Sequence, residues 1–132
     1  MSAAPMQRGL LLFAHGARDP RWAAPFEAIA ARARLREPLW TVQLAYLELM
    51  APTLIEAGDA LASAGCARID VVPLFLGAGG HVRNDLPALL AQLRARHPRI
   101  HWHLQRAIGG RDSVVDAMAD SAVTQLSDDP LP

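Results

Sequence analysis

The hydrophobic residues of this chain fall into four short runs, each followed by turn-forming residues and then by a segment with helical periodicity. The runs cover residues 9–14, 41–46, 69–74 and 100–104. The first three are almost continuously apolar, which is typical of strands buried on both faces, whereas the fourth alternates as an edge strand does. The intervening segments predict four helices, at about 20–36, 52–65, 84–97 and 112–126.

This alternation of strand and helix predicts the fold class. Strand–helix–strand units with short connections build a parallel sheet with right-handed crossovers and helices on its faces. The expected architecture is therefore an α/β three-layer sandwich with a four-stranded parallel sheet.

Local turn chemistry predicts where the helices begin. Asp19 is placed to cap the first helix, with Pro20 at its first position. Pro25 weakens the first turns of that helix, because proline donates no backbone hydrogen bond. Asn84 or Asp85 is expected to open the third helix.

Length and composition indicate one ordinary globular domain over residues 1–132, with a core at about 9–126 and a flexible tail at 127–132. The 13 basic and 13 acidic residues balance to a net charge of zero, which argues against nucleic acid or an anionic membrane as partner. All the basic residues are arginine, and either a G+C-rich genome or a need for carboxylate recognition explains that usage.

The sequence favours a cytoplasmic protein. Its lone cysteine, Cys66, has no partner for an internal disulfide, which fits a reducing compartment. We interpret Cys66, in a turn before an apolar strand, as a small buried residue and not as a nucleophile. The amino-terminal residues lack the pattern of a signal peptide, and no apolar run approaches the roughly 20 residues of a membrane span.

Three residues that can bind metal or move protons follow three of the predicted strands. They are His15 after the first strand, Glu48 after the second, and His81 after the glycine-rich segment 77–80 that follows the third. Ligands of open parallel sheets bind outside the carboxyl ends of the strands, where these residues are expected to converge. Two imidazoles and a carboxylate make a plausible nitrogen and oxygen site for Fe(II), Co(II), Ni(II) or Zn(II).

Each of these residues also has a purely structural explanation. A histidine in a glycine turn is often only a hydrogen-bonded loop residue, and Glu48 is equally explained as the cap of the second helix. His97, at a helix end, suits the helix dipole. His101 and His103 share one face of the edge strand, where a solvated surface is the simpler interpretation.

Arginines near the proposed site suggest an anionic substrate. Arg18, Arg21 and Arg83 could pair with substrate carboxylates, or they could form surface ion pairs with Asp19 and Asp85. The glycines of segment 77–80 allow positive φ and close approach of the backbone to a ligand.

Three motifs resemble the small CbiX-type sirohydrochlorin chelatases of the class II chelatase group. They are LFAHG at 12–16 followed by RDPR at 18–21, then AYLE at 45–48 with Pro52 after it, and PLFLGAGGHVRNDLP at 73–87. The likeness spans roughly residues 9–126, and the third motif is the longest and most specific.

The resemblance implies a chelatase-like domain equal to one half of the bilobal class II fold, which inserts Co²⁺ or Fe²⁺, with Ni²⁺ also possible, into sirohydrochlorin on the routes to cobalamin and siroheme. It implies His15 and His81 as the catalytic and metal-binding pair and Glu48 as the acidic residue that handles metal or protons. The metal is a substrate, and no organic cofactor is expected. Longer relatives fuse two such domains and short ones pair, so a homodimer is expected.

The same resemblance assigns substrate binding to two sets of residues. Arg18, Arg21 and Arg83 would meet the eight carboxylates of sirohydrochlorin, and Gly79 and Gly80 would let the backbone approach a flat, bulky ligand. Neutral imidazoles, with an ordinary pKa of roughly 6.5, can serve as weak metal ligands or as proton acceptors.

One position departs from the family pattern. Relatives usually carry serine after the His-Gly pair, and here Ala17 removes that hydroxyl. A metal or tetrapyrrole carrier with the same two histidines is therefore an alternative. A second alternative for the His15-Gly16 pair is a phosphohistidine hydrolase or mutase. Those proteins need arginine directly before the histidine, and this chain has Ala14 there, which argues against that alternative.

Overall fold

The four predicted strands form one parallel sheet in the order β2–β1–β3–β4. The computed structural model describes residues 6–77, 79–124 and 126, with the backbone alone for residues 80–83. The strands are β1 (Arg8–Ala14), β2 (Thr41–Tyr46), β3 (Arg68–Pro73) and β4 (His101–Leu104), each within one residue of its predicted bounds. Ala14 pairs with Tyr46 across β1 and β2, and Phe13 pairs with Pro73 across β1 and β3, so these three strands end side by side. The predicted α/β class is confirmed.

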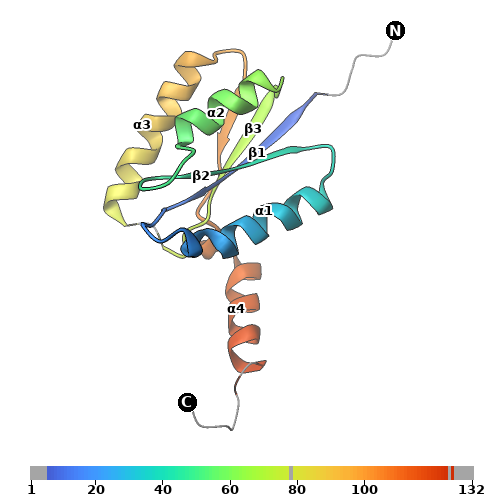
Figure 1. Cartoon of the computed structure of the whole chain (residues 1–132), viewed down its shortest axis with the longest axis vertical. Helices are drawn as coiled ribbons and strands as arrows, with labels where there is room; N and C mark the ends of the chain where they lie inside the picture. The colour runs from blue at the N-terminus through green and yellow to red at the C-terminus, as the bar shows by residue number, and fades with distance from the viewer. Residues whose placement is uncertain (1–5, 78, 125, 127–132) are drawn as a thin grey trace.

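Helices α2 (Leu54–Ser63) and α3 (Gly80–Arg96) cover one face of the sheet, which we call the first face (Figure 1). Alternate residues of the strands point toward these helices and form the larger core. Burial of each leucine or phenylalanine there contributes roughly 1.5–3 kcal/mol. The core residues on this face include Leu11, Phe13, Ala45, Leu54, Leu61, Ile69, Val71, Phe75, Leu86, Leu90, Leu93 and Trp102.

The opposite, second face of the sheet is covered by the short 3₁₀ helix η1 (Pro20–Ala23) and by α1 (Ala24–Arg36). Its smaller core consists of Leu12, Ala14, Ala23, Ala30, Val42, Leu44, Tyr46 and Val72. These contacts lie mainly over β1 and β2, so the β3 side of this face has less helix over it.

The first helical segment differs from its prediction as a single helix. Asp19 does cap it, since its carboxylate accepts the backbone N–H of Arg21 at 2.9 Å with Pro20 at the next position. The segment then begins as η1 and continues as α1 from Ala24. Pro25 explains the division, because its missing donor is harmless only in the first turn of a helix, where it lies in α1.

The predicted start of the third helix at Asn84 or Asp85 is wrong. Helix α3 begins at Gly80, and its N-cap is Gly79 in an extended conformation with no side-chain cap. A glycine cap leaves no polar side chain in the sequence to mark it, which is why the sequence pointed further along. The helix also contains Pro87 in its interior.

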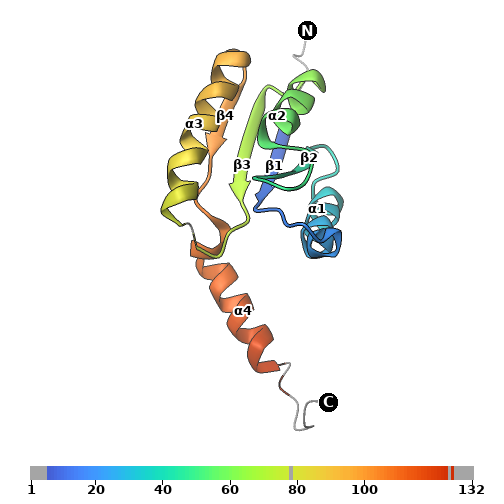
Figure 2. The same ribbon diagram turned by 60° about the vertical axis from the view of Figure 1, so that its left-hand side comes forward.

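The last helix, α4 (Asp112–Thr124), follows a second 3₁₀ helix, η2 (Ile108–Gly110), and extends away from the sheet (Figure 2). None of its residues is buried. The three-layer architecture is therefore built by α2 and α3 on one face and by η1 and α1 on the other, with α4 standing apart. Within the described ranges, we find no helix with the length and apolar character needed to cross a bilayer.

Candidate functional site

His15 is the first residue beyond β1 and lies at the carboxyl end of the sheet. Its side chain is exposed, while the strand that carries it is buried from Leu11 to Ala14. The imidazole packs against the ring of Phe75, with 4.4 Å between ring centroids and an angle of 52° between the planes. Phe75 itself is 3% exposed and follows β3 by two residues. A buried strand and a buried aromatic ring thus support an exposed imidazole.

Backbone hydrogen bonds place Glu48 beside His15. The Leu47 N–H donates to the Ala14 carbonyl at 2.9 Å, and the Glu48 N–H donates to the His15 carbonyl at 3.1 Å. Gly16 allows this approach: its φ is +90°, and a Cβ there would lie 1.9 Å from the Glu48 carbonyl oxygen. No other residue fits that position without displacing the loop. His15 and Glu48, both exposed, are therefore held on adjacent backbone segments.

The structure excludes the alternative that Glu48 caps the second helix. Thr53 is the N-cap of α2, and it exchanges hydrogen bonds with Glu56 in a capping box at 3.2 and 3.0 Å. Glu48 lies five residues earlier, in the loop that leaves β2. Leu49, beside it, has a φ of +66°, a conformation that side chains with a Cβ rarely adopt.

His81 and Arg83 lie in the first turns of α3, and their side chains are outside the described residues. Earlier in the same connection, the Leu74 N–H donates to the Phe13 carbonyl at 2.7 Å and Phe75 touches His15, so the segment after β3 starts at the site. Gly79 is exposed and has a φ of −67°, so it does not use the positive φ that a glycine allows.

The space beside the glycine segment is open. A Cβ built on Gly77 or on Gly79 would meet no atom within 4 Å, and neither residue has positive φ. Gly80 is the first residue of α3, and residue 78 is outside the described residues. Gly77 and Gly79 therefore leave unfilled space beside the backbone, and neither is required by a positive φ.

Two of the predicted substrate-binding arginines, Arg18 and Arg21, are exposed near the same end of the sheet. Arg21 forms a two-point contact with Asp19, with hydrogen bonds of 3.1 and 2.8 Å. The side-chain hydrogen bond from Arg21, followed by its backbone N–H, lowers the pKa of Asp19. Arg21 thus adopts the ion pair that the sequence left open as the alternative, while remaining accessible. Ala17, in the loop between His15 and Arg18, is half-buried.

The remaining histidines are placed differently. His97 lies within hydrogen-bonding distance of Asp59, with 2.6 Å between Nε2 and Oδ1, and its ring packs near that of Trp102. His101 and His103 are exposed on the edge strand, as expected of a solvated strand face. Among the described side chains, no three His, Cys, Asp or Glu residues gather closely enough to hold a metal ion.

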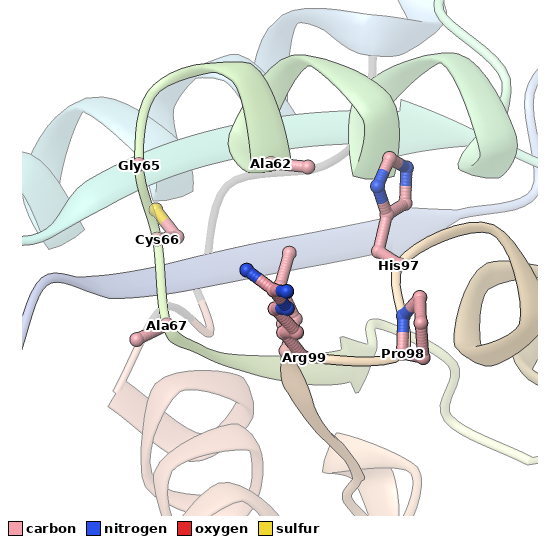
Figure 3. Close-up of a pocket in the computed structure, with 8 residues that line it drawn as sticks. Ala62, Gly65, Cys66, Ala67, His97, Pro98 and Arg99 are labelled. Carbon is pink, nitrogen blue, oxygen red and sulfur yellow. The ribbon is translucent and has the colours of Figure 1, made fainter.

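A cavity of about 410 Å³ lies at the opposite, amino end of the sheet. Figure 3 shows that the turn between α2 and β3, with Gly65 and Cys66, borders it on one side, and the connection from His97 to Arg99 on the other. Cys66 is 3% exposed, and burial raises the pKa of its thiol. The interpretation of Cys66 as a small buried residue is confirmed.

Sequence reasoning did not single out Phe75 or Leu49 at the site. The signal for Phe75 was an aromatic residue directly after a buried strand, but the sequence does not show which ring it will meet. The positive φ of Leu49 has no sequence signal, because leucine is among the residues that do not favour it.

The fold and the site together define an open α/β domain whose exposed imidazole and carboxylate lie outside the carboxyl ends of adjacent parallel strands. The chain belongs to the CbiX family, whose sequence model matches residues 9–125.

Individual relatives agree with this assignment. The chain is 30% identical over 119 residues to the sirohydrochlorin cobaltochelatase of Sulfolobus acidocaldarius, covering 90% of this chain and 93% of that protein. It is 29% identical over 117 residues to the sirohydrochlorin ferrochelatase of Bacillus subtilis, covering 86% of this chain but only 43% of the longer protein. The crystal structure of the sirohydrochlorin chelatase SirB from Bacillus subtilis subspecies spizizenii in complex with cobalt superposes with a TM-score of 0.79 at 26% identity, covering 91% of this chain and 51% of SirB.

Proposed function

We propose that this chain is a chelatase that inserts a divalent metal, Co²⁺ or Fe²⁺ with Ni²⁺ also possible, into sirohydrochlorin. The observation that carries the proposal is the exposed imidazole of His15, fixed on a buried strand and backed by Phe75 at the carboxyl end of the sheet. Its support from relatives is the similarity to named sirohydrochlorin chelatases of half and of full length.

The reaction exchanges one metal ion for two pyrrole N–H protons of the macrocycle. His15 and His81 are proposed as the ligands that deliver the metal, and Glu48 as an acceptor for protons released at the ring. The backbone pairing between His15 and Glu48 supports this division, because it keeps an imidazole and a carboxylate on neighbouring segments. Imidazole binds these metals without the hold of a thiolate cage, which suits transfer to ring nitrogens.

Binding of the tetrapyrrole is proposed to use two features of the same end of the sheet. Arg18, Arg21 and Arg83 would meet the substrate carboxylates, and Arg21 would exchange its exposed contact with Asp19 for a substrate carboxylate. Gly79 and Gly80 would face the macrocycle, supported by the open space around Gly79. The amino end of α3, at Gly80, adds a favourable electrostatic environment for a carboxylate.

The chain is further proposed to work as a homodimer in the cytoplasm. It matches almost the whole of a half-length cobaltochelatase but about half of SirB, so two copies correspond in size to the longer enzyme. A cytoplasmic setting agrees with the buried free thiol of Cys66.

The direct test is to mix the purified protein with sirohydrochlorin and Co²⁺ or Fe²⁺ and to follow the absorption change of the macrocycle. We expect insertion well above the rate without protein. His81→Ala should abolish that acceleration, whereas His101→Ala, an exposed histidine on the edge strand, should leave it unchanged. Binding of metal or tetrapyrrole without accelerated insertion would refute the enzyme and favour a carrier.

A further inference from the structure

Two histidines outside the candidate site lie on one short strand and share a face of the sheet. Strand β4 has the sequence His-Trp-His-Leu, and successive residues of a strand point to opposite faces. Trp102 is 5% exposed and packs in the core on the first face. His101 and His103 therefore project from the second face, and both side chains are exposed there.

The backbone that carries this pair of histidines is held at both ends. The His101 N–H donates to the Ala67 carbonyl, and the Gln105 N–H, just after β4, donates to the Val71 carbonyl, both at 2.9 Å. The rise of two residues along a strand separates the Cα atoms of His101 and His103 by about 6.5 Å. The sheet thus fixes the spacing and the direction of the two side chains.

Neither imidazole of the pair is occupied by a protein partner. Within the part of the chain that the structure describes, no hydrogen bond, ion pair or ring contact involves the side chain of His101 or His103. His97 shows the contrast, since its ring lies 2.6 Å from the Asp59 carboxylate. The ring nitrogens of the pair therefore have no protein group to displace before they bind a ligand.

The charged neighbours of the pair are matched to one another. Strand pairing puts His101 beside Arg68 and His103 beside Asp70. The Asp70 carboxylate accepts hydrogen bonds from Arg68 at 3.3 Å and from Arg8 at 3.2 Å, so it is not free to act as a third metal ligand. Two arginines exceed one carboxylate by one positive charge. An ion attracted by charge alone, such as Mg²⁺, is therefore disfavoured, and only an ion with a preference for imidazole suits this surface.

We propose that His101 and His103 together chelate one divalent transition-metal ion, with water in its remaining positions, at a second site on the edge strand. Imidazole suits Ni²⁺, Cu²⁺ and Zn²⁺, with a bond of about 2.0–2.1 Å to zinc. Two rings on Cα atoms about 6.5 Å apart can tilt toward one ion. Once the first ring binds, the second is held nearby at a high effective concentration, and the fixed backbone lowers the entropy cost of ordering both.

The proposed edge-strand site is too far from His15 to share its ion. Strand pairing aligns His103 with Asp70, and Asp70 with Leu10 of β1. His15 lies five residues beyond Leu10, which corresponds to about 16 Å along the strand. Strand β3 also separates β1 from β4. The inference is therefore independent of the proposed function.

The first test measures Ni²⁺ binding by isothermal titration calorimetry at about pH 7.5, on a chain without an affinity tag. His15→Ala and His81→Ala are introduced together to remove the candidate site, and thermal melts check the fold. We expect one Ni²⁺ per chain, not displaced by an excess of Mg²⁺. His101→Gln or His103→Gln should each weaken binding by about tenfold or more, because the chelate is lost. Absence of binding, displacement by Mg²⁺, or no loss in either variant would overturn the proposal.

A matched variant keeps two histidines on β4 but separates them. His103→Gln combined with Leu104→His places the second imidazole on the opposite face of the strand, at a residue that is 38% exposed. This protein should bind Ni²⁺ no more tightly than His103→Gln alone. Binding as tight as in the parent chain would show that the histidines act singly, and would refute the chelate.

Nuclear magnetic resonance assigns the metal to its residues. Ni²⁺ is paramagnetic and broadens the signals of nearby protons, so ring signals of His101 and His103 should disappear together, at lower Ni²⁺ than those of His97. Earlier loss of the His97 signals, or loss from one member of the pair alone, would contradict the assignment. Metal insertion by the unaltered chain is measured separately. Its absence would refute the chelatase and leave the edge-strand site standing.

Discussion

His15 and His97 lie at opposite ends of the sheet and are held in opposite ways. His97 is 25% exposed, within 2.6 Å of the Asp59 carboxylate, which also accepts a hydrogen bond from Arg96 at 3.0 Å. His15 is exposed, and among the described residues its imidazole has a ring contact with Phe75 but no hydrogen bond. The first arrangement gives the imidazole a hydrogen-bonding partner, whereas the second supports the ring on one side and, among the described side chains, gives its nitrogens no partner.

The surroundings of the two imidazoles distinguish a structural histidine from a candidate functional one, which the positions of His97 and His15 in the sequence do not. The contact between His97 and the Asp59 carboxylate joins the end of α3 to α2. Removal of the His97 imidazole should therefore lower the free energy of unfolding. The ring beside His15 fixes an orientation without occupying the nitrogens, so removal of His15 should be felt in the reaction. The predictions below test this contrast.

The largest effect is expected from His15→Ala. Loss of a metal ligand or proton acceptor should lower the rate of insertion by about 100-fold or more, with little change in Tm because the side chain is exposed. His97→Ala should do the opposite: it should keep the rate and lower stability by about 1 kcal/mol. The two rates and two thermal melts form one experiment. An active His15→Ala variant, or an inactive but folded His97→Ala variant, would reverse the assignment.

Next comes the ring that supports His15. Phe75→Leu keeps an apolar side chain but removes the surface that meets the imidazole at 4.4 Å, so the rate should fall beyond what lost stability explains. The matched control is Phe13→Leu, whose ring meets Phe75 at 5.8 Å on the buried side. Both variants should lose about 1–2 kcal/mol of stability, as shortened core residues do. Equal rates in the two variants would show that Phe75 only fills the core.

The same contrast explains how far the sequence could be interpreted. Strand positions were predictable because each apolar run is bounded by turn residues, and His15 and Glu48 could be placed at strand ends for that reason. The sequence could not show that Gly79 caps α3, since a glycine cap has no side chain to mark it. Nor could the sequence place the Phe75 ring against His15. Hydrophobic periodicity indicates which face of a strand or helix a residue lies on, but not which side chain from another element it contacts.

The position of α4 is the other feature beyond the reach of the pattern. The sequence predicted a helix over 112–126, and the helix is present over Asp112–Thr124. The alternation of strands and helices predicted helices on the faces of the sheet, but this order of elements does not show which helix covers which face. Gly109, just before α4, packs closely against the backbone of Leu76. This is a tertiary contact, which the local sequence pattern does not reveal.

A smaller effect is expected at the His97 end in acid. Hydrogen bonds from Arg96 and then from His97 lower the pKa of Asp59 below its usual value. A carboxyl group with a lowered folded pKa contributes stability above about pH 5, and this contribution is lost as the pH falls through the folded value. Asp59→Asn should therefore reduce stability by at most about 1 kcal/mol at neutral pH, since the pair is partly exposed, and should flatten the decline in acid.

Urea unfolding of the two proteins at a series of pH values measures this difference. The curves should converge only at a pH below the lowered folded pKa of Asp59, where the carboxyl group is protonated in both the folded and unfolded states. A constant gap across the whole range would mean that Asp59 acts through packing and not through its charge.

The smallest effect is expected in the loop that carries Glu48. Leu49 has a φ of +66° and is 59% exposed, so it stores backbone strain and gains little from burial. Leu49→Gly relieves that strain but adds freedom to the unfolded chain, and the two terms oppose each other to leave a change within about 1 kcal/mol. The matched variant Leu39→Gly, 90% exposed and without positive φ, adds the same freedom with no strain to relieve and should be the less stable of the two. Denaturant midpoints compare them directly. If Leu49→Gly is instead the less stable and also slows insertion, the leucine holds Glu48 in place beside His15, and the loop belongs to the site and not merely to the fold.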